Sequence, residues 1–248
     1  MKKILLGTVA ALAMGTSASA ADMAARPYTK APMAVAQVMS WTGFYIGAQG
    51  GYGWGSSDEV FFNGPNTAAF LGTQKYDMTG GFAGGVVGYN WQTGAVVLGL
   101  EGDYHWSDIS GRSSVINLAP NLGDTYFTKL RGFGDIKGRL GYAAGPALFF
   151  VSGGAAVGDL QHRYDGVPGN VFVQNNTKWG YTVGAGVEYM FAQNWSGKLE
   201  YNYIDLGKST IQYTPVVTNR SEWTDTFHTV KAGINYHFNM GGPVVARY

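Results

Sequence analysis

Three titratable residues fall on alternate positions of one short segment, AVVLGLEGDYHW, which contains Glu101, Asp103 and His105. In a β-strand, side chains at positions i, i+2 and i+4 lie on the same face. An imidazole beside two carboxylates can bind a divalent metal ion or act as a general base. The same spacing also fits a hydrogen-bonded network inside a barrel, and this second interpretation is the one we favour.

The sequence carries no recognisable catalytic motif. It has no cysteine, which excludes a thiol nucleophile, a thiolate metal site and a disulfide framework. It also lacks the GxSxG, HExxH and P-loop patterns. We therefore predict that the protein is not an enzyme, and we assign no catalytic residue and no metal ligand.

Two further histidines, His162 and His228, lie in or beside segments that are predicted to be long loops. Histidine is a common axial ligand of haem iron, so both are candidate ligands of haemin. Solvated or membrane-interface histidines would produce the same pattern. We therefore expect no cofactor, and keep haemin binding through His162 and His228 as the alternative.

Alternation of apolar and polar residues dominates the chain after Trp41. In WSGKLEYNY, for example, Leu199 and Tyr201 alternate with Lys198 and Glu200. A period of two is typical of a β-strand with two different faces. The pattern predicts eight strands, near residues 41–54, 75–91, 95–107, 125–143, 147–159, 178–191, 195–206 and 226–238.

The segments that connect these strands are alternately long and short. The short ones are residues 92–94, 144–146 and 192–194, and the long ones are polar and rich in Gly, Ser and Asn. Short turns at one end and long loops at the other are typical of outer-membrane barrels. The sequence therefore predicts an all-β fold, an eight-stranded antiparallel transmembrane up-and-down β-barrel, whose apolar face contacts lipid and whose charged face lines the lumen.

The predicted lumen face carries charges of both signs. Eight strands enclose a space that side chains can just fill, so we expect opposite charges to pair across it and to close it. A narrow charge-lined pore is the alternative. The predicted lumen network consists of Glu101, Asp103, His105, Lys129, Arg131, Asp135, Lys137, Arg139, Glu188, Lys198, Glu200 and Lys231.

The N-terminus has the pattern of a secretory signal. Lys2 and Lys3 precede an apolar run, and Ala18-Ser19-Ala20 fits a cleavage site for signal peptidase. We predict a signal peptide at 1–20, a flexible periplasmic lead-in at 21–40, the barrel at 41–238, and a C-terminal tail or strand extension at 239–248. Lys and Arg number 17 against 16 for Asp and Glu, which gives no basic footprint for nucleic acid.

Glycine-rich strand motifs cover nearly all of residues 41–238. The segments are WTGFYIGAQGGYGW, GGFAGGVVGYNWQ, GRLGYA, SGGAAVG, YTVGAGVEY, NWSGKLEYNYIDLG and HTVKAGINYHF. Together they resemble the small porin-like outer-membrane immunogenic proteins of alphaproteobacteria, a family with haemin-binding relatives. The resemblance implies an eight-stranded barrel in the cell outer membrane, reached after signal-peptide cleavage, with a structural and surface-antigen role. A small-solute porin or a haemin receptor is the alternative.

The resemblance also implies partners. They are outer-membrane lipid and lipopolysaccharide, the barrel assembly machinery, and host or surface ligands. The last strand resembles the signal that the assembly machinery recognises, through Lys231, Gly233, Tyr236 and Phe238. Many such chains stop at the final aromatic residue, whereas this one continues as NMGGPVVARY. Either this tail is periplasmic, or Tyr248 is the terminal aromatic residue of a longer strand.

Overall fold

The computed structural model describes residues 39–63, 69–114, 125–166, 170–212 and 220–239. The predicted signal peptide, most of the lead-in and residues 240–248 lie outside this range. The described residues form eight strands: β1 Gly43–Asn63, β2 Ala69–Thr93, β3 Val96–Ser114, β4 Thr125–Ala144, β5 Ala147–Gly166, β6 Asn170–Ala192, β7 Trp195–Gln212 and β8 Arg220–Asn239.

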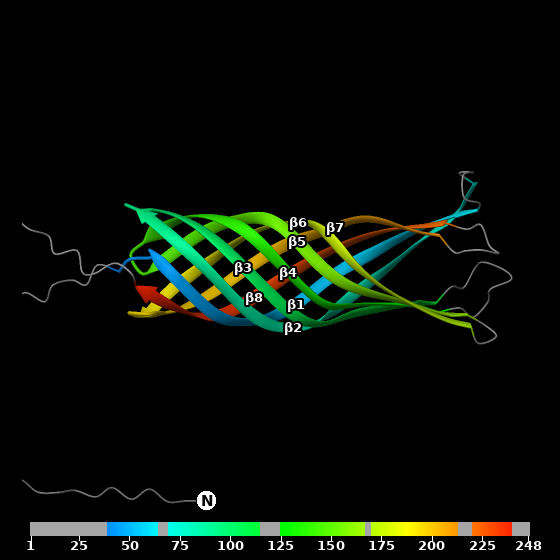
Figure 1. Ribbon diagram of the computed structural model, residues 1–248, viewed down its shortest axis with the longest axis horizontal. Coiled ribbons are helices and arrows are strands. Elements are labelled where there is room, and N and C mark those ends of the chain that lie inside the picture. Colours follow the sequence, from blue (N-terminus) through cyan, green and yellow to red (C-terminus); the bar gives the residue numbers. More distant parts are fainter. Residues whose placement is uncertain (1–38, 64–68, 115–124, 167–169, 213–219, 240–248) are drawn as a thin grey trace, which may run out of the picture. The chain divides into compact units, whose positions relative to one another are not determined.

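Each strand pairs antiparallel with its neighbours in sequence, and β8 pairs with β1 to close the barrel (Figure 1). Closure gives every backbone N–H and C=O of the central region a partner within the sheet. Two-residue turns join β2 to β3 and β4 to β5, and Gly94 and Gly145 adopt φ values of 61° there. Glycine tolerates this left-handed conformation because it has no Cβ. The predicted fold class is confirmed.

The two faces of the sheet are inverted relative to a water-soluble protein. Leu98, Leu100 and Ile136 point outward with exposed fractions of 55%, 57% and 72%, whereas Glu101 and Lys137 are 2% and 1% exposed inside the barrel. A period-two strand places consecutive residues on opposite faces, so an apolar outer belt and a polar lumen follow directly from the sequence. No helix that could cross a bilayer occurs among the described residues.

Aromatic side chains mark both edges of this apolar belt. Trp91 and Trp195 lie near the short turns, at what we call the turn end, and are 49% and 45% exposed. Trp54, Trp106 and Trp179 lie further along their strands towards the long connections, at what we call the loop end, and all three are exposed. Tryptophan favours the boundary between hydrocarbon and water because its ring is apolar and its N–H is polar.

The strands extend well beyond the belt at the loop end. We predicted that the first strand ends near residue 54, whereas β1 runs to Asn63, and β6 begins at Asn170 rather than near 178. The outer face of the extensions carries charged residues such as Asp58 and Lys75, while Met78 and Leu130 are buried inside, so the apolar outer face that marks a membrane strand is lost there. Seven of the eight strand limits predicted at the loop end were therefore wrong, whereas the predicted start of β4 at 125 is confirmed and the limits at the short turns were close.

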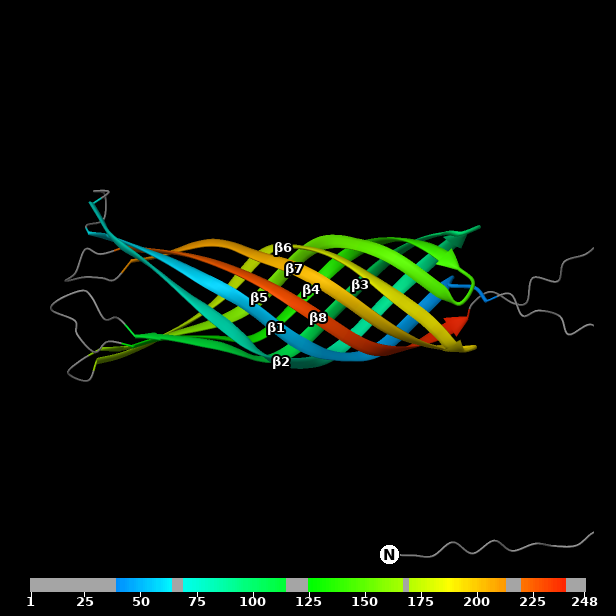
Figure 2. The same cartoon turned by 180° about the vertical axis from the view of Figure 1, so that it is seen from behind.

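Above the belt the barrel divides into two four-stranded sheets. Pairing of β2 with β3 ends at Thr79↔Ser110, and pairing of β6 with β7 ends at Tyr181↔Asp205. The other six neighbouring pairs continue into the extensions. Figures 1 and 2 show the result as two prongs, one containing β7, β8, β1 and β2 and the other containing β3 to β6.

Irregular pairing occurs in several strands at this same level. The register shifts between Trp106 and Ile109 in β3, between Leu130 and Gly132 in β4, and between Asp205 and Lys208 in β7. An extra residue in one strand bends it and changes which residues face inward. The bulges therefore separate the regular membrane barrel from the two sheets beyond it.

Candidate functional site

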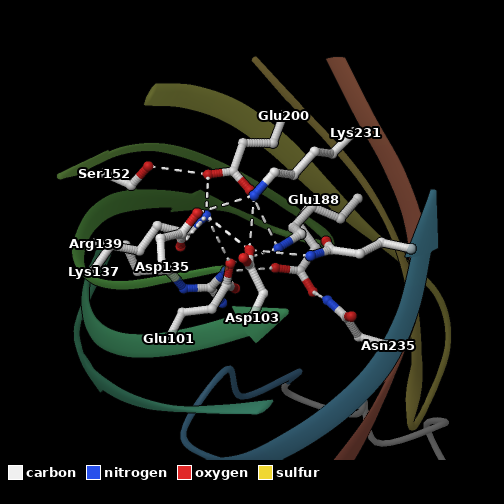
Figure 3. A network of polar contacts seen from close by, with 12 residues as sticks. Glu101, Asp103, Asp135, Lys137, Arg139, Ser152, Glu188, Glu200, Lys231 and Asn235 are labelled. Atoms are coloured by element: carbon white, nitrogen blue, oxygen red, sulfur yellow. Dashed lines mark hydrogen bonds and ion pairs between the residues drawn. The ribbon is translucent and has the colours of Figure 1, made fainter. Parts of the chain in front are cut away.

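The centre of the lumen is an ion network built around Lys137 of β4 (Figure 3). Its ammonium lies 2.9 Å from Glu200, 3.2 Å from Glu101, and 3.3 Å from both Asp103 and Asp135. All these side chains are fully buried. Because β3, β4 and β7 contribute these groups, the network joins strands across the lumen as well as along the wall.

Two more lysines reach the same carboxylates from the other side of the barrel. Lys231 of β8 donates to Asp103 at 2.8 Å and to Asp135 at 3.1 Å. Lys198 of β7 donates to Glu101 at 2.7 Å. Each carboxylate thus faces more than one cation, which offsets part of the large cost of removing charges from water.

Arg139 extends the network towards the turn end. Its Nη1 lies 3.0 Å from Glu188, and its Nε donates to Asn90 at 2.9 Å. The other Glu188 oxygen accepts from Ser196 at 2.6 Å and from Asn235 at 2.7 Å. The described network holds four Lys or Arg residues and five carboxylates, so it is close to electrically neutral without any bound ion.

His105 belongs to this network. Its Nδ1 lies 3.5 Å from Asp103, its Nε2 lies 2.9 Å from Gln49, and its ring stacks on Phe133 at a centroid distance of 4.8 Å. Protein groups therefore surround both ring nitrogens. Among the described residues, no three His, Cys, Asp or Glu side chains converge as metal ligands would.

An apolar layer lies at the turn end of the network. Along β3 the inward residues run from Val97 through Glu101 and His105 to Ile109, so an apolar side chain stands on each side of the charged ones. Trp41, which precedes β1, is 1% exposed and packs edge-on against His237. The buried members of this turn-end layer are Trp41, Val97, Leu148, Phe150 and Met190.

A larger apolar layer lies at the loop end of the network. Glycine makes room for it, since a Cβ on Gly158 would lie 2.6 Å from Cδ1 of Leu206 on β7. Gly53 gives Ile109 of β3 room in the same way. The loop-end layer consists of Tyr76, Met78, Phe82, Ile109, Leu130, Phe133, Ala156, Leu160, Ile204, Leu206 and Phe227.

Beyond the loop-end layer lie buried polar groups, and the pair of Lys178 and Asp225 connects the two sheets. Asp225 of β8 accepts from Lys178 of β6 and from Ser57 of β1, both at 2.6 Å. Thr128 and His162 are joined at 3.0 Å. His162 lies above the apolar belt, and burial lowers its pKa to about 4. We call Ser57, Thr128, His162, Lys178 and Asp225 the outer polar bridge.

The structure corrects two predicted lumen residues, Lys129 and Arg131. Arg131 is exposed, and Lys129 pairs at 2.6 Å with Asp108, whose side chain is 81% exposed. The physical reason is the bulge in β4, at which the inward face changes from even to odd positions. Leu130, which lies between these two residues in the sequence, faces the lumen for the same reason and is 2% exposed. The other predicted members of the network all lie in the lumen, where Figure 3 shows most of them.

The candidate haemin ligands lie on opposite faces of the wall. His162 is buried in the lumen. His228 is on the outer face, where its Nδ1 lies 2.6 Å from the Tyr201 hydroxyl and its ring stacks on Trp54. The structure therefore does not bring His162 and His228 together as a pair of ligands for one iron.

The residues of the predicted assembly signal divide between the two faces of β8. Lys231 takes part in the lumen network. Tyr236 packs edge-on against Trp195 at 5.1 Å and against Phe238 at 5.0 Å. Phe238 is 48% exposed in the apolar belt at the turn end.

Uncharged polar residues complete the network, and the sequence analysis did not select them. Tyr45 donates to Glu101 at 2.6 Å, Ser152 donates to Glu200 at 3.0 Å, and Gln49 donates to Asp103 at 3.1 Å. Each of them shares the inward parity of its strand. A search for every polar residue on the charged face, rather than for charges alone, would have found them.

Residues 8–238 match the family described as outer membrane protein beta-barrel domain. The chain belongs to this family. It is 38% identical over 245 residues to the 31 kDa outer-membrane immunogenic protein of Brucella melitensis, covering 96% of this chain and 100% of that protein. It is 34% identical over 167 residues to the 22 kDa outer membrane protein of Rhizobium leguminosarum bv. viciae, covering 67% and 64% of the two chains.

Solved outer-membrane barrels are also similar in structure. The outer membrane protein OprG of Pseudomonas aeruginosa is 12% identical, with a TM-score of 0.47 and coverage of 79% of this chain and 97% of that one. Family membership confirms that this chain is an outer-membrane β-barrel protein of the immunogenic-protein group. The turn end therefore faces the periplasm and the loop end faces the cell exterior.

Proposed function

We propose that this barrel is a closed structural protein of the outer membrane that presents its loop end as a surface for contact with other molecules, rather than a diffusion channel. One observation carries the proposal: the lumen contains three successive filled layers. The turn-end layer, the ion network and the loop-end layer occupy consecutive inward positions of the same strands. A solute crossing the lumen would have to displace paired charges and two apolar layers.

Planar-bilayer recording of the folded, signal-cleaved protein tests this proposal. We expect no steady open-channel current from the parent protein. A variant with Trp41→Ala, Phe150→Ala and Phe133→Ala opens both apolar layers, and should conduct more than the parent. Steady nanosiemens-scale openings of the parent would contradict the closed lumen and favour the porin alternative.

The aromatic edges of the belt and the last strand support two of the expected partners. The proposed contact with outer-leaflet lipid and lipopolysaccharide rests on the aromatic edge of the belt and on Arg131, which the bulge directs outward just above Trp106. The proposed recognition by the barrel assembly machinery rests on Lys231, Gly233, Tyr236 and Phe238 of β8. Phe238→Ala should slow assembly in reconstituted membranes, whereas Ile234→Ala on the same outer face serves as the matched control.

Haemin binding stays a prediction that no observation favours over the closed barrel. The two histidines cannot ligate one iron together, because the wall of the barrel separates them, so each is a separate candidate ligand. Absorption titration of the variants His162→Ala and His228→Ala would identify which one, since only the loss of a true ligand changes the Soret band. We also infer no enzymatic activity and assign no catalytic residue.

A further inference from the structure

The division of the barrel above the belt leaves four strand edges without a partner among the described residues. These edges are residues 69–78 of β2, 111–114 of β3, 170–180 of β6 and 206–212 of β7. Figures 1 and 2 show the two prongs that these edges border. An unpaired edge presents a row of N–H and C=O groups that can pair with another extended chain.

The β6 edge differs from the other three in its composition. Residues 171–177, VFVQNNT, contain no charge, no proline and no glycine. The β2 edge carries Lys75 and Asp77, and the short β3 edge carries Arg112. Charges and proline are the usual means by which proteins prevent pairing at an edge. Residues 171–177 lack them, and Lys178 next to them is buried and paired with Asp225, so this segment is the one best suited to accept a strand.

The facing β7 edge supplies a charge. The bulge between Asp205 and Lys208 turns β7 away from β6 and towards β8. Lys208 is exposed on the outer face of this edge, where it lies opposite Thr224 of β8. The inward neighbour Leu206 is 2% exposed and belongs to the loop-end layer. A strand between β6 and β7 would thus meet a cation on its outer face and apolar side chains on its inner face.

We propose that residues 171–177 bind an extended, acidic segment of another protein at the cell surface by strand addition. Main-chain hydrogen bonds to β6 supply the affinity, and Lys208 selects acidic side chains on alternate positions of the segment. This binding mode is independent of the lumen, so it goes beyond the closed structural barrel proposed above. A conducting lumen would leave it unchanged.

The test uses three labelled eight-residue peptides with the folded, signal-cleaved protein in detergent micelles. One alternates Val and Glu, the second alternates Val and Lys, and the third is the Val–Glu peptide N-methylated at alternate residues on its pairing edge. Fluorescence anisotropy should show at least about tenfold weaker binding of the N-methylated peptide, which is about 1.4 kcal/mol. The Val–Lys peptide should also bind more weakly than the Val–Glu peptide at low salt, and amide exchange at 171–177 should slow when Val–Glu binds.

Two charge reversals give matched protein controls. Lys208→Glu should invert the preference from the Val–Glu to the Val–Lys peptide. Lys75→Glu, the same change on the β2 edge, should leave the preference unchanged. Equal binding of the N-methylated peptide, no binding of any peptide at millimolar concentration, or inversion by Lys75→Glu instead would overturn the proposal. Self-association through β6 that excludes the peptide, detected by sedimentation, would also overturn it in favour of a second copy as the occupant.

Discussion

Lys178 of β6 donates a hydrogen bond of 2.6 Å to Asp225 of β8, although these two strands are not neighbours in the barrel. The pair joins the two sheets at the level where β6 and β7 have separated. Both side chains are buried, with exposed fractions of 6% and 0%. The outer polar bridge thus takes over part of the role that main-chain pairing has within the membrane.

Asp225→Asn should therefore destabilise the barrel. Removing one partner of a buried ion pair leaves an uncompensated charge, which typically costs about 3–5 kcal/mol. The measurement is urea unfolding of the protein folded into lipid vesicles. Asp58→Asn is the control, because its pair with Lys75 is exposed and should contribute less than about 1 kcal/mol. Equal losses for the two variants would show that the bridge has no special role.

The ion network should respond to Lys137→Met in the same assay. The substitution leaves several carboxylates facing each other, and we expect a loss of about 3–5 kcal/mol. Adding Glu200→Gln should recover part of the loss, because the double variant has one negative charge fewer around the position that the Lys137 ammonium occupied. The 2.9 Å contact indicates that the two residues are coupled. If the loss of stability in the double variant equals the sum of the losses in the two single variants, they are not coupled.

Arginine on the lipid face should be costly only within the apolar belt. Leu100→Arg, near the middle of the part of β3 between the two aromatic edges, should cost roughly 2–4 kcal/mol, the value typical of the bilayer midplane. Val173→Arg is a close match, since Val173 and Leu100 are 54% and 57% exposed, yet Val173 lies on the extension beyond the belt. This control should stay within about 0.5 kcal/mol of the parent, as surface substitutions usually do. Similar costs at both positions would show that the membrane boundary inferred here is wrong.

Stability should fall in mildly acidic solution because of His162. Its pKa is lowered by burial from 6.5 to about 4, so between these values the unfolded chain binds more protons than the folded one. The stabilising contribution is present in full above about pH 6.5 and is lost as the pH falls towards 4, by up to about 3 kcal/mol.

Urea unfolding across this range measures the effect, and His162→Asn should flatten the curve. The variant His228→Asn is the control, because His228 lies on the outer face. An unchanged pH dependence in His162→Asn would assign the acid sensitivity to another group.

Much of the fold follows from the sequence because membrane strands obey a strict alternation. Leu98 and Glu101 have the faces that their positions in β3 predict, and two glycine-containing turns lie where short polar connections were expected. Arg131 was misplaced because alternation cannot reveal a bulge: one extra residue reverses every face beyond it. The extensions were missed because the outer face beyond the belt is no longer apolar, as the exposed pair of Asp58 and Lys75 shows, so the pattern of a membrane strand ends there.

The bulge at Arg131 also has an evolutionary consequence. Within the membrane portion of a strand, adding or deleting one residue would turn a row of ionic side chains towards the acyl chains, so length changes there are tolerated only in twos or with a second, compensating bulge. Beyond the loop-end layer and the outer polar bridge no such parity rule applies, because there neither face of a strand is committed to lipid or to the packed lumen. We therefore expect related chains to differ freely in the length of their external hairpins while their transmembrane segments keep a fixed residue count.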